Sequence, residues 1–199
     1  MTFDYRLYVI TDGRPDLLNR VEAALLGGAT CVQYREKTKS ATQMIKEATD
    51  LKVLCHKYGV PLLVNDDPEV AKAVGADGLH LGQSDATLAA ARKLLPRDFP
   101  IGVSAHTVAE AIEAEENGAV YVGVGAMFPT HSKSDATLIS QETASAIKAN
   151  ISIPMLLIGG ISLERAQQLT VPYDGLCVIS AILSAENPRK AAQDLKEIL

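Results

Sequence analysis

Cationic residues that can bind anions follow short apolar runs in this sequence. Arg35 and Lys37 come directly after one run, and Lys133 lies shortly after another. An arginine offers paired donors to a phosphate, and a lysine adds a mobile point charge. The chain has a formal net charge of −5, so binding an anion requires a local gathering of positive charge. These residues can form such a cluster, although each alone could be a solvated surface residue.

Two aspartates follow neighbouring apolar runs and could serve a metal. Asp66 comes after one run and Asp85 after the next. Mg²⁺ typically keeps several waters and is held by one or two carboxylates together with substrate phosphates. The alternative is helix capping or turn formation, because Asp85 directly precedes an expected helix and Asp66 stands beside Asn65. The sequence leaves both readings open.

Small residues near the end of the chain indicate a phosphate site. Gly159-Gly160 follows the seventh apolar run, and Ile179-Ser180 follows the eighth. In barrel enzymes the loops after strands seven and eight often bind phosphate. Small residues let backbone N–H groups come close to an anion. An ordinary glycine turn is the alternative, and the pairing with the eighth run favours phosphate binding.

Histidine and serine residues near the same ends add candidate acids, bases and contacts. His80, His106 and His131 could each act as an acid or base, whereas His56 belongs to a polar helix face. Ser104 lacks an evident base partner in the sequence. It is therefore better suited to contacting a substrate than to acting as an activated nucleophile.

Eight short apolar runs must position these residues. They are rich in β-forming residues and nearly continuous, as in strands covered on both sides. They span Leu7–Ile10, Cys31–Tyr34, Pro61–Val64, Gly78–Leu81, Ile101–Val103, Val120–Val124, Met155–Ile158 and Gly175–Ile179. Between and after them we expect helices over Leu17–Leu26, Ala41–Lys57, Pro68–Val74, Ala86–Leu95, Val108–Asn117, Ser140–Ala149, Leu163–Leu169 and Pro188–Leu199.

The alternation predicts an α/β fold, a single (β/α)₈ TIM barrel that forms one catalytic domain over residues 1–199. A Gly-Ala pair recurs at Gly28, Gly75 and Gly118, where a helix is expected to turn back into a strand. Repeated βα units produce such an echo. An open doubly wound sheet uses the same alternation. It is disfavoured because no G-x-G-x-x-G motif follows the first run.

Composition narrows the classes of partner. The 199 residues are 47% hydrophobic, contain no Trp and have no block of Lys or Arg. Nucleic acid or an anionic membrane surface is therefore not expected as a main partner. Three scattered cysteines without a C-x-x-C pair fit a reducing compartment, and no signal-peptide or membrane-spanning pattern stands out. We expect a cytoplasmic protein that acts on small molecules; a homo-oligomer is compatible with the sequence and is not specified by it.

Taken together, these segments resemble the thiamine phosphate synthase family. The resemblance spans nearly the whole chain in order. It rests on Tyr8-Val9-Ile10-Thr11-Asp12, Gln33-Tyr34-Arg35-Glu36-Lys37, Asn65-Asp66, His80-Leu81-Gly82-Gln83-Ser84-Asp85, Gly102-Val103-Ser104-Ala105-His106, Gly123-Val124-Gly125, Phe128-Pro129-Thr130-His131-Ser132-Lys133, Ile158-Gly159-Gly160-Ile161 and Ile179-Ser180-Ala181-Ile182. One departure is Ser132, where the family often has Thr, and the hydroxyl is kept.

The resemblance implies a barrel that joins hydroxymethylpyrimidine diphosphate to thiazole phosphate with Mg²⁺, giving thiamine phosphate and pyrophosphate. It implies pyrimidine diphosphate binding by Gln33, Arg35, Lys37, Asn65 and Lys133, with Ser104 near the reacting centre, and Mg²⁺ binding by Asp66 and Asp85. Tyr34 and Glu36, which stand between these residues, are also expected to contact substrate. Thiazole phosphate would contact Thr130, His131, Ser132, Gly160, Ile179 and Ser180. Arg35, Ser104 and Lys133 would assist catalysis.

We expect a dissociative alkyl transfer in which the pyrimidine methylene becomes a cation before the thiazole nitrogen attacks. No protein nucleophile is then required. A thiazole tautomerase on the same scaffold is one alternative, and a non-catalytic barrel that binds thiamine precursors is another. Both are disfavoured by the combined cations and carboxylates, because binding a thiazole phosphate requires no carboxylate pair.

Overall fold

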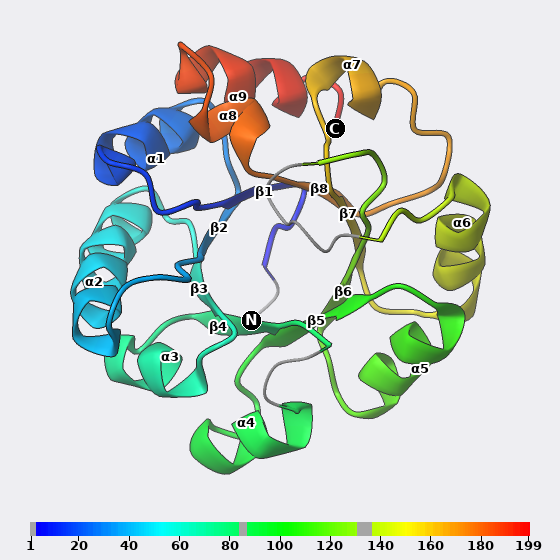
Figure 1. Ribbon diagram of the computed structural model, residues 1–199, viewed down its shortest axis with the longest axis horizontal. Helices are drawn as coiled ribbons and strands as arrows, with labels where there is room; N and C mark the ends of the chain where they lie inside the picture. Colours follow the sequence, from blue (N-terminus) through cyan, green and yellow to red (C-terminus); the bar gives the residue numbers. More distant parts are fainter. Residues whose placement is uncertain (1–2, 84–86, 131–136) are drawn as a thin grey trace.

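Eight parallel strands close into a barrel, and helices surround it (Figure 1). The computed structural model describes residues 3–83, 87–130 and 137–199. The strands pair in chain order, and the eighth pairs with the first. They are β1 (Leu7–Ile10), β2 (Cys31–Tyr34), β3 (Leu62–Asn65), β4 (Gly78–Leu81), β5 (Ile101–Ala105), β6 (Tyr121–Val124), β7 (Met155–Ile158) and β8 (Gly175–Val178). The predicted (β/α)₈ barrel is confirmed, and each strand lies within two residues of its expected bounds.

The helices follow the strands in alternation and form the outer ring (Figure 1). Those in the described residues are α1 (Leu17–Leu26), α2 (Ala41–Lys57), α3 (Pro68–Val74), α4 (Leu88–Leu94), α5 (Val108–Glu116), α6 (Gln141–Asn150), α7 (Leu163–Ala166), α8 (Ser180–Leu183) and α9 (Pro188–Lys196). The short α8 is additional to the helices expected from the sequence. None of the helices in the described part of the chain is long and apolar enough to cross a membrane.

The helix starts correct the capping explanation of the two aspartates. Helix α3 is capped by Asp67, whose side chain accepts a hydrogen bond from Val70 N at 3.0 Å. Helix α4 starts two residues later than expected, and Thr87 caps it by accepting from Ala90 N at 3.2 Å. Asp66 is therefore not a helix cap. Asp85 lies outside the described residues, and the cap of α4 is Thr87.

The repeated Gly-Ala pairs form one helix-ending motif three times. Gly28, Gly75 and Gly118 all have positive φ angles, of 101°, 62° and 87°. In each case the following alanine N–H donates to the carbonyl five residues earlier, at 2.9 to 3.0 Å. This is the six-to-one bond of a Schellman motif, which satisfies carbonyls at a helix end and favours glycine. The repeated Gly-Ala pair in the sequence therefore corresponds to the same backbone hydrogen bond at three helix ends.

Strand register divides the core into two layers. One large cluster lies between the strands and the helices and holds most of the buried apolar side chains. A second, smaller cluster fills the barrel and consists of Tyr5, Tyr8, Ile10, Cys31, Leu63, Tyr121, Leu156 and Cys177. Because successive side chains of a strand face opposite sides, register alone decides which residues join which layer.

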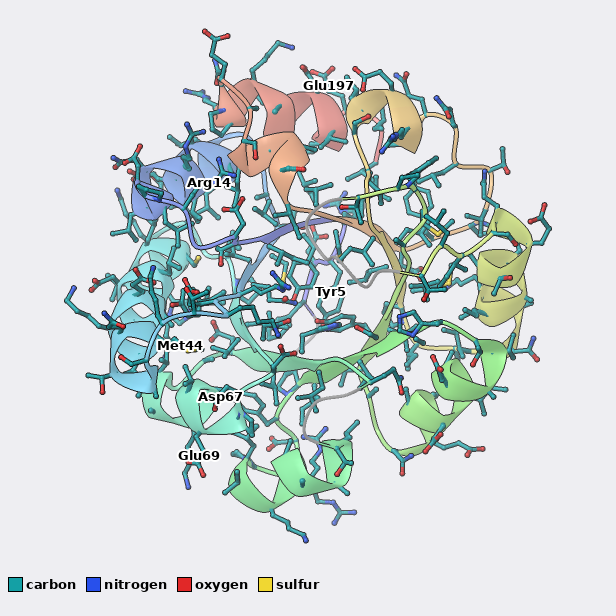
Figure 2. All side chains as sticks on the ribbon, viewed as in Figure 1. Tyr5, Arg14, Met44, Asp67, Glu69 and Glu197 are labelled. Carbon is teal, nitrogen blue, oxygen red and sulfur yellow. The ribbon has the colours of Figure 1, made fainter. Side chains whose placement is uncertain are left out.

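Tyrosine rings fill the barrel interior, and one of them packs against a glycine. The chain before β1 passes inside the ring of strands, where Tyr5 lies, whereas Glu69 and Glu197 lie on the outer ring of helices (Figure 2). The centroids of the Tyr5 and Tyr121 rings are 4.7 Å apart. Gly102 pairs with Tyr121 in register, and a Cβ on Gly102 would lie 2.0 Å from the Tyr121 ring. The barrel interior therefore accommodates this ring only beside a residue without a side chain.

A Gly102→Ala substitution should destabilise the barrel by about 3 kcal/mol or more, because overpacking forces a buried ring to move. Gly118→Ala is the control, because its Cβ would meet nothing within 4 Å and only its positive φ of 87° opposes a side chain. That variant should lose about 1 kcal/mol from the left-handed conformation alone. Urea unfolding measures both changes, and equal losses would contradict the packing of Tyr121 against Gly102.

Candidate functional site

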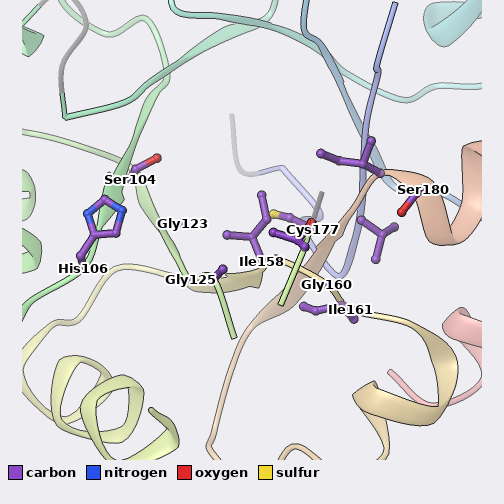
Figure 3. A pocket seen from close by; sticks show the side chains of 14 residues that line it. Ser104, His106, Gly123, Gly125, Ile158, Gly160, Ile161, Cys177 and Ser180 are labelled. Atoms are coloured by element: carbon purple, nitrogen blue, oxygen red, sulfur yellow. The ribbon is translucent and has the colours of Figure 1, made fainter. Parts of the chain in front are cut away.

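A cavity of about 120 Å³ opens at the carboxyl ends of the strands and is called the inner cavity here. Ser104 and His106 of β5 and its exit lie on one side of it, and Gly160, Ile161 and Ser180 lie on the other (Figure 3). Its lining is completed by Gly123, Gly125, Ala126, Thr130, Ile158, Gly159, Cys177, Val178 and Ile179. A mostly apolar pocket with a few polar groups is the usual form of a small-molecule site.

An adjoining space of about 750 Å³, the outer cavity, is more polar. Two guanidinium side chains line it, Arg35 from the β2 exit and Arg165 from α7, together with Asp12. The two cavities share a wall made of Thr130, Gly160, Ile161, Ile179 and Ser180. An apolar inner space thus continues into an outer space that carries positive charge.

The Gly159-Gly160 turn is built for close approach. Both residues have positive φ angles, 96° and 64°. A Cβ on Gly160 would lie 2.6 Å from the carbonyl oxygen of Pro129, and one on Gly159 would lie 2.5 Å from Ala126. The turn is therefore pressed against the loop after β6, and glycine is required at both positions.

Arg165 ties the β6 and β7 exits together, a role that sequence reasoning did not assign. One of its terminal nitrogens donates to Gly160 O at 2.8 Å and to Pro129 O at 3.2 Å. Its guanidinium also lies 5.4 Å from the centroid of the Phe128 ring. Its only sequence signal was a cation shortly after the seventh run, which is also common on solvated helix surfaces.

The β2 exit is held by a buried threonine. Thr11 Oγ1 donates to Arg35 O at 3.1 Å and accepts from Arg35 N at 2.8 Å. Thr11 is fully buried. These two bonds fix the backbone from which the Arg35 side chain reaches the outer cavity. Gln33, also buried, points into the barrel and donates to the Tyr8 hydroxyl at 2.9 Å.

Two of the predicted contact residues point elsewhere. The Tyr34 side chain belongs to the layer between strands and helices, and its hydroxyl donates to Glu47 of α2 at 2.8 Å. Substrate contact through its side chain would need a different orientation. The Glu36 carboxylate is turned into its own loop, where it accepts from Lys37 N, Thr38 N and the Thr38 hydroxyl at 2.7 to 2.9 Å.

The Glu36 loop bonds strongly favour the charged carboxylate. Burial of this side chain, only 4% exposed, acts to raise its pKa. The hydrogen bonds from Thr38 and Lys37 and the contact with Lys39 outweigh burial and lower the pKa to about 2. Glu36 therefore acts as an internal brace of the loop that presents Arg35 and Lys37.

Asp66 lies at the rim in a left-handed conformation, with φ of 64°. Its carboxylate forms an ion pair with Lys37, and its N–H donates to His80 O at 2.8 Å. Asn65 pairs in register with His80, and alternation from the inward Leu63 places Asn65 inside the barrel. Asp66 thus supplies an accessible carboxylate between β3 and β4, with a cation already beside it.

A carboxylate oxygen donor of this kind fits a hard cation such as Mg²⁺, which needs only one or two protein carboxylates. Among the described residues there is no group of three or more His, Cys, Asp or Glu side chains that could enclose a metal. An all-protein cage is therefore not the form of site that the described residues offer. Four predicted site residues, Asp85, His131, Ser132 and Lys133, lie outside the described residues.

Ser104 lies at the inner cavity, and both its side chain and its backbone are hydrogen-bonded to residues of β4 and the segment after it. Its hydroxyl oxygen is 3.0 Å from His80 Nε2, and its carbonyl accepts from Gln83 Nε2 at 2.6 Å. His106 is bound differently, because its N–H donates to Glu110 at 2.6 Å and its Nδ1 lies 3.2 Å from the same carboxylate. Both residues were predicted at this rim, and the structure places both at the cavity.

Comparison with known proteins gives consistent results over the full chain. A family model described as thiamine monophosphate synthase matches residues 7–182. The chain is 44% identical over 201 residues to a thiamine-phosphate synthase of Clostridium acetobutylicum, covering 98% of this chain and 95% of that protein. It is 46% identical over 200 residues to one of Ruminiclostridium cellulolyticum, with the same coverage of both chains.

A solved structure agrees with these relatives. The chain is similar to the thiamine phosphate pyrophosphorylase from Pyrococcus furiosus, with a TM-score of 0.89 and 38% sequence identity. The match covers 98% of this chain and 95% of that one. The whole barrel, including the strand ends that line both cavities, therefore corresponds to that structure.

Replacing Glu36 with Gln should lower the free energy of unfolding at pH 7 by about 2 kcal/mol, because charge-assisted bonds within the loop are lost. The pKa of Glu36 is lower in the folded protein than its ordinary value of 4.5. The difference from the unsubstituted protein should therefore be complete above pH 4.5 and disappear as the pH falls toward about 2.

Urea unfolding at several pH values measures this difference. Glu116→Gln, at an exposed position at the end of α5, serves as the control and should change little. A loss in Glu36→Gln that stays constant between pH 7 and pH 3 would contradict the role of the charged carboxylate.

Proposed function

Since the chain belongs to the thiamine monophosphate synthase family, we propose that the strand ends around its inner and outer cavities bind the two substrates of that reaction. The protein is a thiamine-phosphate synthase, a transferase that joins a pyrimidine and a thiazole moiety. The observation that carries the assignment of sites is the shared wall between an apolar inner cavity and a cationic outer one. That arrangement suits a flat ring with an anionic tail.

The thiazole phosphate is assigned to the side formed by β6, β7 and β8. Gly160, Ile179 and Ser180 would hold its phosphate, and Thr130, His131 and Ser132 would complete that site. The support is that Gly160, Ile179 and Ser180 line both cavities, together with their position after strands seven and eight. Arg165 would stabilise the same wall through its bonds to Gly160 and Pro129.

The pyrimidine diphosphate is assigned to the side formed by β2, β3 and β4. Gln33 and Asn65 point into the barrel, and Arg35, Lys37 and Lys133 would neutralise the diphosphate. Asp66 and Asp85 would hold Mg²⁺, which when bound supplies further positive charge to the leaving phosphate oxygens. Lys37, now paired with Asp66, would then be available to the diphosphate. Tyr34 would contribute its backbone, and Glu36 would brace the loop.

The reaction then proceeds by a dissociative alkyl transfer. The bond between the pyrimidine methylene carbon and the diphosphate oxygen breaks, and its electron pair leaves with pyrophosphate. The electron-rich aminopyrimidine stabilises the methylene cation, and the thiazole nitrogen donates its lone pair to form the new C–N bond. Arg35 and Lys133 stabilise the charge that grows on the leaving group. Ser104 lies at the cavity where the two substrates would meet.

The protein's other task is to keep water from the cation. The inner cavity is lined largely by glycine and aliphatic residues, which offer few groups that hold water. This reaction requires no residue to act as a nucleophile. Ser104 is therefore not assigned that role, although its hydroxyl lies beside His80, which also contacts the Tyr121 hydroxyl. The named relatives favour this reaction over the tautomerase and over a non-catalytic binding barrel.

We propose that residues 1–199 act as one catalytic domain, because a single closed barrel extends over the described residues. A cytoplasmic location is supported by three buried cysteines that are all free. Small molecules are the proposed partners, without nucleic acid or membrane, and a homo-oligomer stays compatible with the fold.

The purified protein should form thiamine phosphate and pyrophosphate from the pyrimidine diphosphate and the thiazole phosphate when Mg²⁺ is supplied. Chromatographic detection of both products in a timed assay tests this. Adding excess chelator should stop product formation, and restoring Mg²⁺ should recover it. Product formation at an unchanged rate without divalent cation would contradict the proposed role of Mg²⁺, and the absence of product under all conditions would contradict the function.

Replacing Asp66 with Asn should raise the Mg²⁺ concentration needed for half-maximal activity by about tenfold or more, since a charged ligand is lost. Titrating activity against Mg²⁺ measures this shift. The matched control is Asp98→Asn, in the turn before β5 at the opposite end of the barrel. Equal Mg²⁺ dependence in both variants would remove Asp66 from the metal site.

A further inference from the structure

A chain of hydrogen bonds crosses the inside of the barrel from β2 to the inner cavity. Gln33 Nε2 donates to the Tyr8 hydroxyl at 2.9 Å, and the hydroxyls of Tyr8 and Tyr121 are 3.0 Å apart. The Tyr121 hydroxyl is 2.9 Å from His80 Nδ1, and His80 Nε2 is 3.0 Å from Ser104 Oγ. Four bonds on strands β1, β2, β4, β5 and β6 therefore link the interior to Ser104.

The bond from Gln33 to Tyr8 sets the donor and acceptor roles along this series of hydrogen bonds. Since the Gln33 amide donates, the Tyr8 oxygen accepts and its own proton is available to Tyr121. The Tyr121 hydroxyl then donates to His80 Nδ1, which must be the unprotonated ring nitrogen. In the neutral imidazole the proton is then on Nε2, which donates to the Ser104 oxygen. The Ser104 proton is left to point away from His80, toward the inner cavity.

Burial keeps the tyrosines neutral and their hydroxyls ordered. Tyr8 and Tyr121 are fully buried, and burial raises the pKa of each hydroxyl well above 10. The His80 ring also stacks on the Tyr121 ring, with centroids 5.6 Å apart and planes inclined by 21°. Stacking and the bond to Nδ1 together fix the orientation of the imidazole. Hydrogen bonds in such a low-dielectric interior are stronger than in water.

We propose that Tyr121 is a positioning residue which, with Tyr8 and Gln33 behind it, holds His80 as the Nε2–H tautomer, so that the Ser104 hydroxyl donates its hydrogen bond into the substrate cavity. Neither tyrosine touches the cavity, so both act through His80 and Ser104. These hydrogen bonds make the Ser104 hydroxyl a donor toward the cavity, because His80 Nε2 already carries a proton and cannot accept the one on Ser104.

A fixed donor at this position suits a substrate atom that gains negative charge during the reaction. On the proposed function, on which this step rests, that atom is an oxygen of the departing diphosphate. A hydrogen bond to such an atom strengthens in the transition state, so its loss lowers kcat more than it raises KM. A purely structural role for Tyr121 would instead change stability and leave the kcat of the folded enzyme unaltered.

The tautomer can be measured without any substrate. Long-range ¹H–¹⁵N NMR of the ligand-free protein distinguishes the protonated from the unprotonated ring nitrogen, and a His80→Gln variant assigns the signals. We expect His80 with its proton on Nε2. In Tyr121→Phe, which removes one hydroxyl and keeps the ring, we expect the two tautomers to mix. An Nδ1–H tautomer in the unsubstituted protein, or unchanged signals in Tyr121→Phe, would overturn the proposal.

Kinetics of the same variants provide the second test. Tyr121→Phe should lower kcat about tenfold with KM changed less than about twofold, as for other residues that orient a contacting group. Tyr8→Phe should lower kcat less, because Tyr121 can still donate to His80. Tyr5→Phe is the matched control, since Tyr5 packs against Tyr121 and its hydroxyl is not part of the chain. It should leave kcat unchanged.

A double-substitution cycle distinguishes an effect of Tyr121 on Ser104 through His80 from an effect of Tyr121 on the packing of the barrel. In a Ser104→Ala background, Tyr121→Phe should cause no further loss of kcat, because the group it orients is already gone. Additive losses, or equal losses in Tyr121→Phe and Tyr5→Phe, would overturn the proposal. If the unsubstituted protein forms no thiamine phosphate, the proposed function fails, and the tautomer measurement alone still decides whether Tyr121 sets the state of His80.

Discussion

Pairing of β8 with β1 closes the sheet, and this closure determines the surroundings of every residue inside the barrel. Tyr8 pairs with Cys177 across this seam and with Cys31 on the other side. Because side chains alternate along a strand, a slip of one residue would turn the inward set of a strand outward. The Tyr8 hydroxyl would then leave Gln33 and Tyr121, and the interior would lose both its polar chain and a large ring.

Inside that closed sheet, tyrosines and glycines fill the volume together. The rings of Tyr5, Tyr8 and Tyr121 pack in one cluster, and Gly102 leaves the space that Tyr121 takes. Their hydroxyls would be costly to bury without partners, and the Tyr8 and Tyr121 hydroxyls form the chain that ends on Ser104. The same side chains therefore pack the lower barrel and reach the residue at the cavity above it.

At the carboxyl ends of the strands, three side chains hold the segments that carry the proposed substrate-binding residues. Thr11 fixes the Arg35 backbone, Glu36 braces the loop that carries Arg35 and Lys37, and Arg165 joins the exits of β6 and β7. Each uses short hydrogen bonds to backbone atoms near strand ends. Because Thr11 and Arg165 belong to neighbouring elements, the exits of β2 and β6 depend on side chains from adjacent segments for their shape. The family assignment rests on the whole chain, and these braces explain how this sequence builds the site.

Local sequence pattern is enough to predict the strands and helices, and the end of the barrel at which polar groups gather. Apolar runs, helix caps and the repeated Gly-Ala turns act through neighbours a few residues away, so their consequences follow from local pattern. The resemblance to a known family was also visible in short motifs at strand ends, because Arg35, Asn65, Ser104 and Gly159 follow those runs directly.

The direction in which each side chain faces, and the side chains that it contacts, depend on how distant segments pack together. The run Cys31–Tyr34 is continuously apolar apart from Gln33, so nothing in it shows that Gln33 points inward and Tyr34 outward to Glu47. Tyr8 and Tyr121 are 113 residues apart, and their bond exists because closure brings β1 and β6 around one interior. Local pattern sets the backbone of each segment, whereas register and packing between distant segments set the partners, and the partners give Ser104 its orientation.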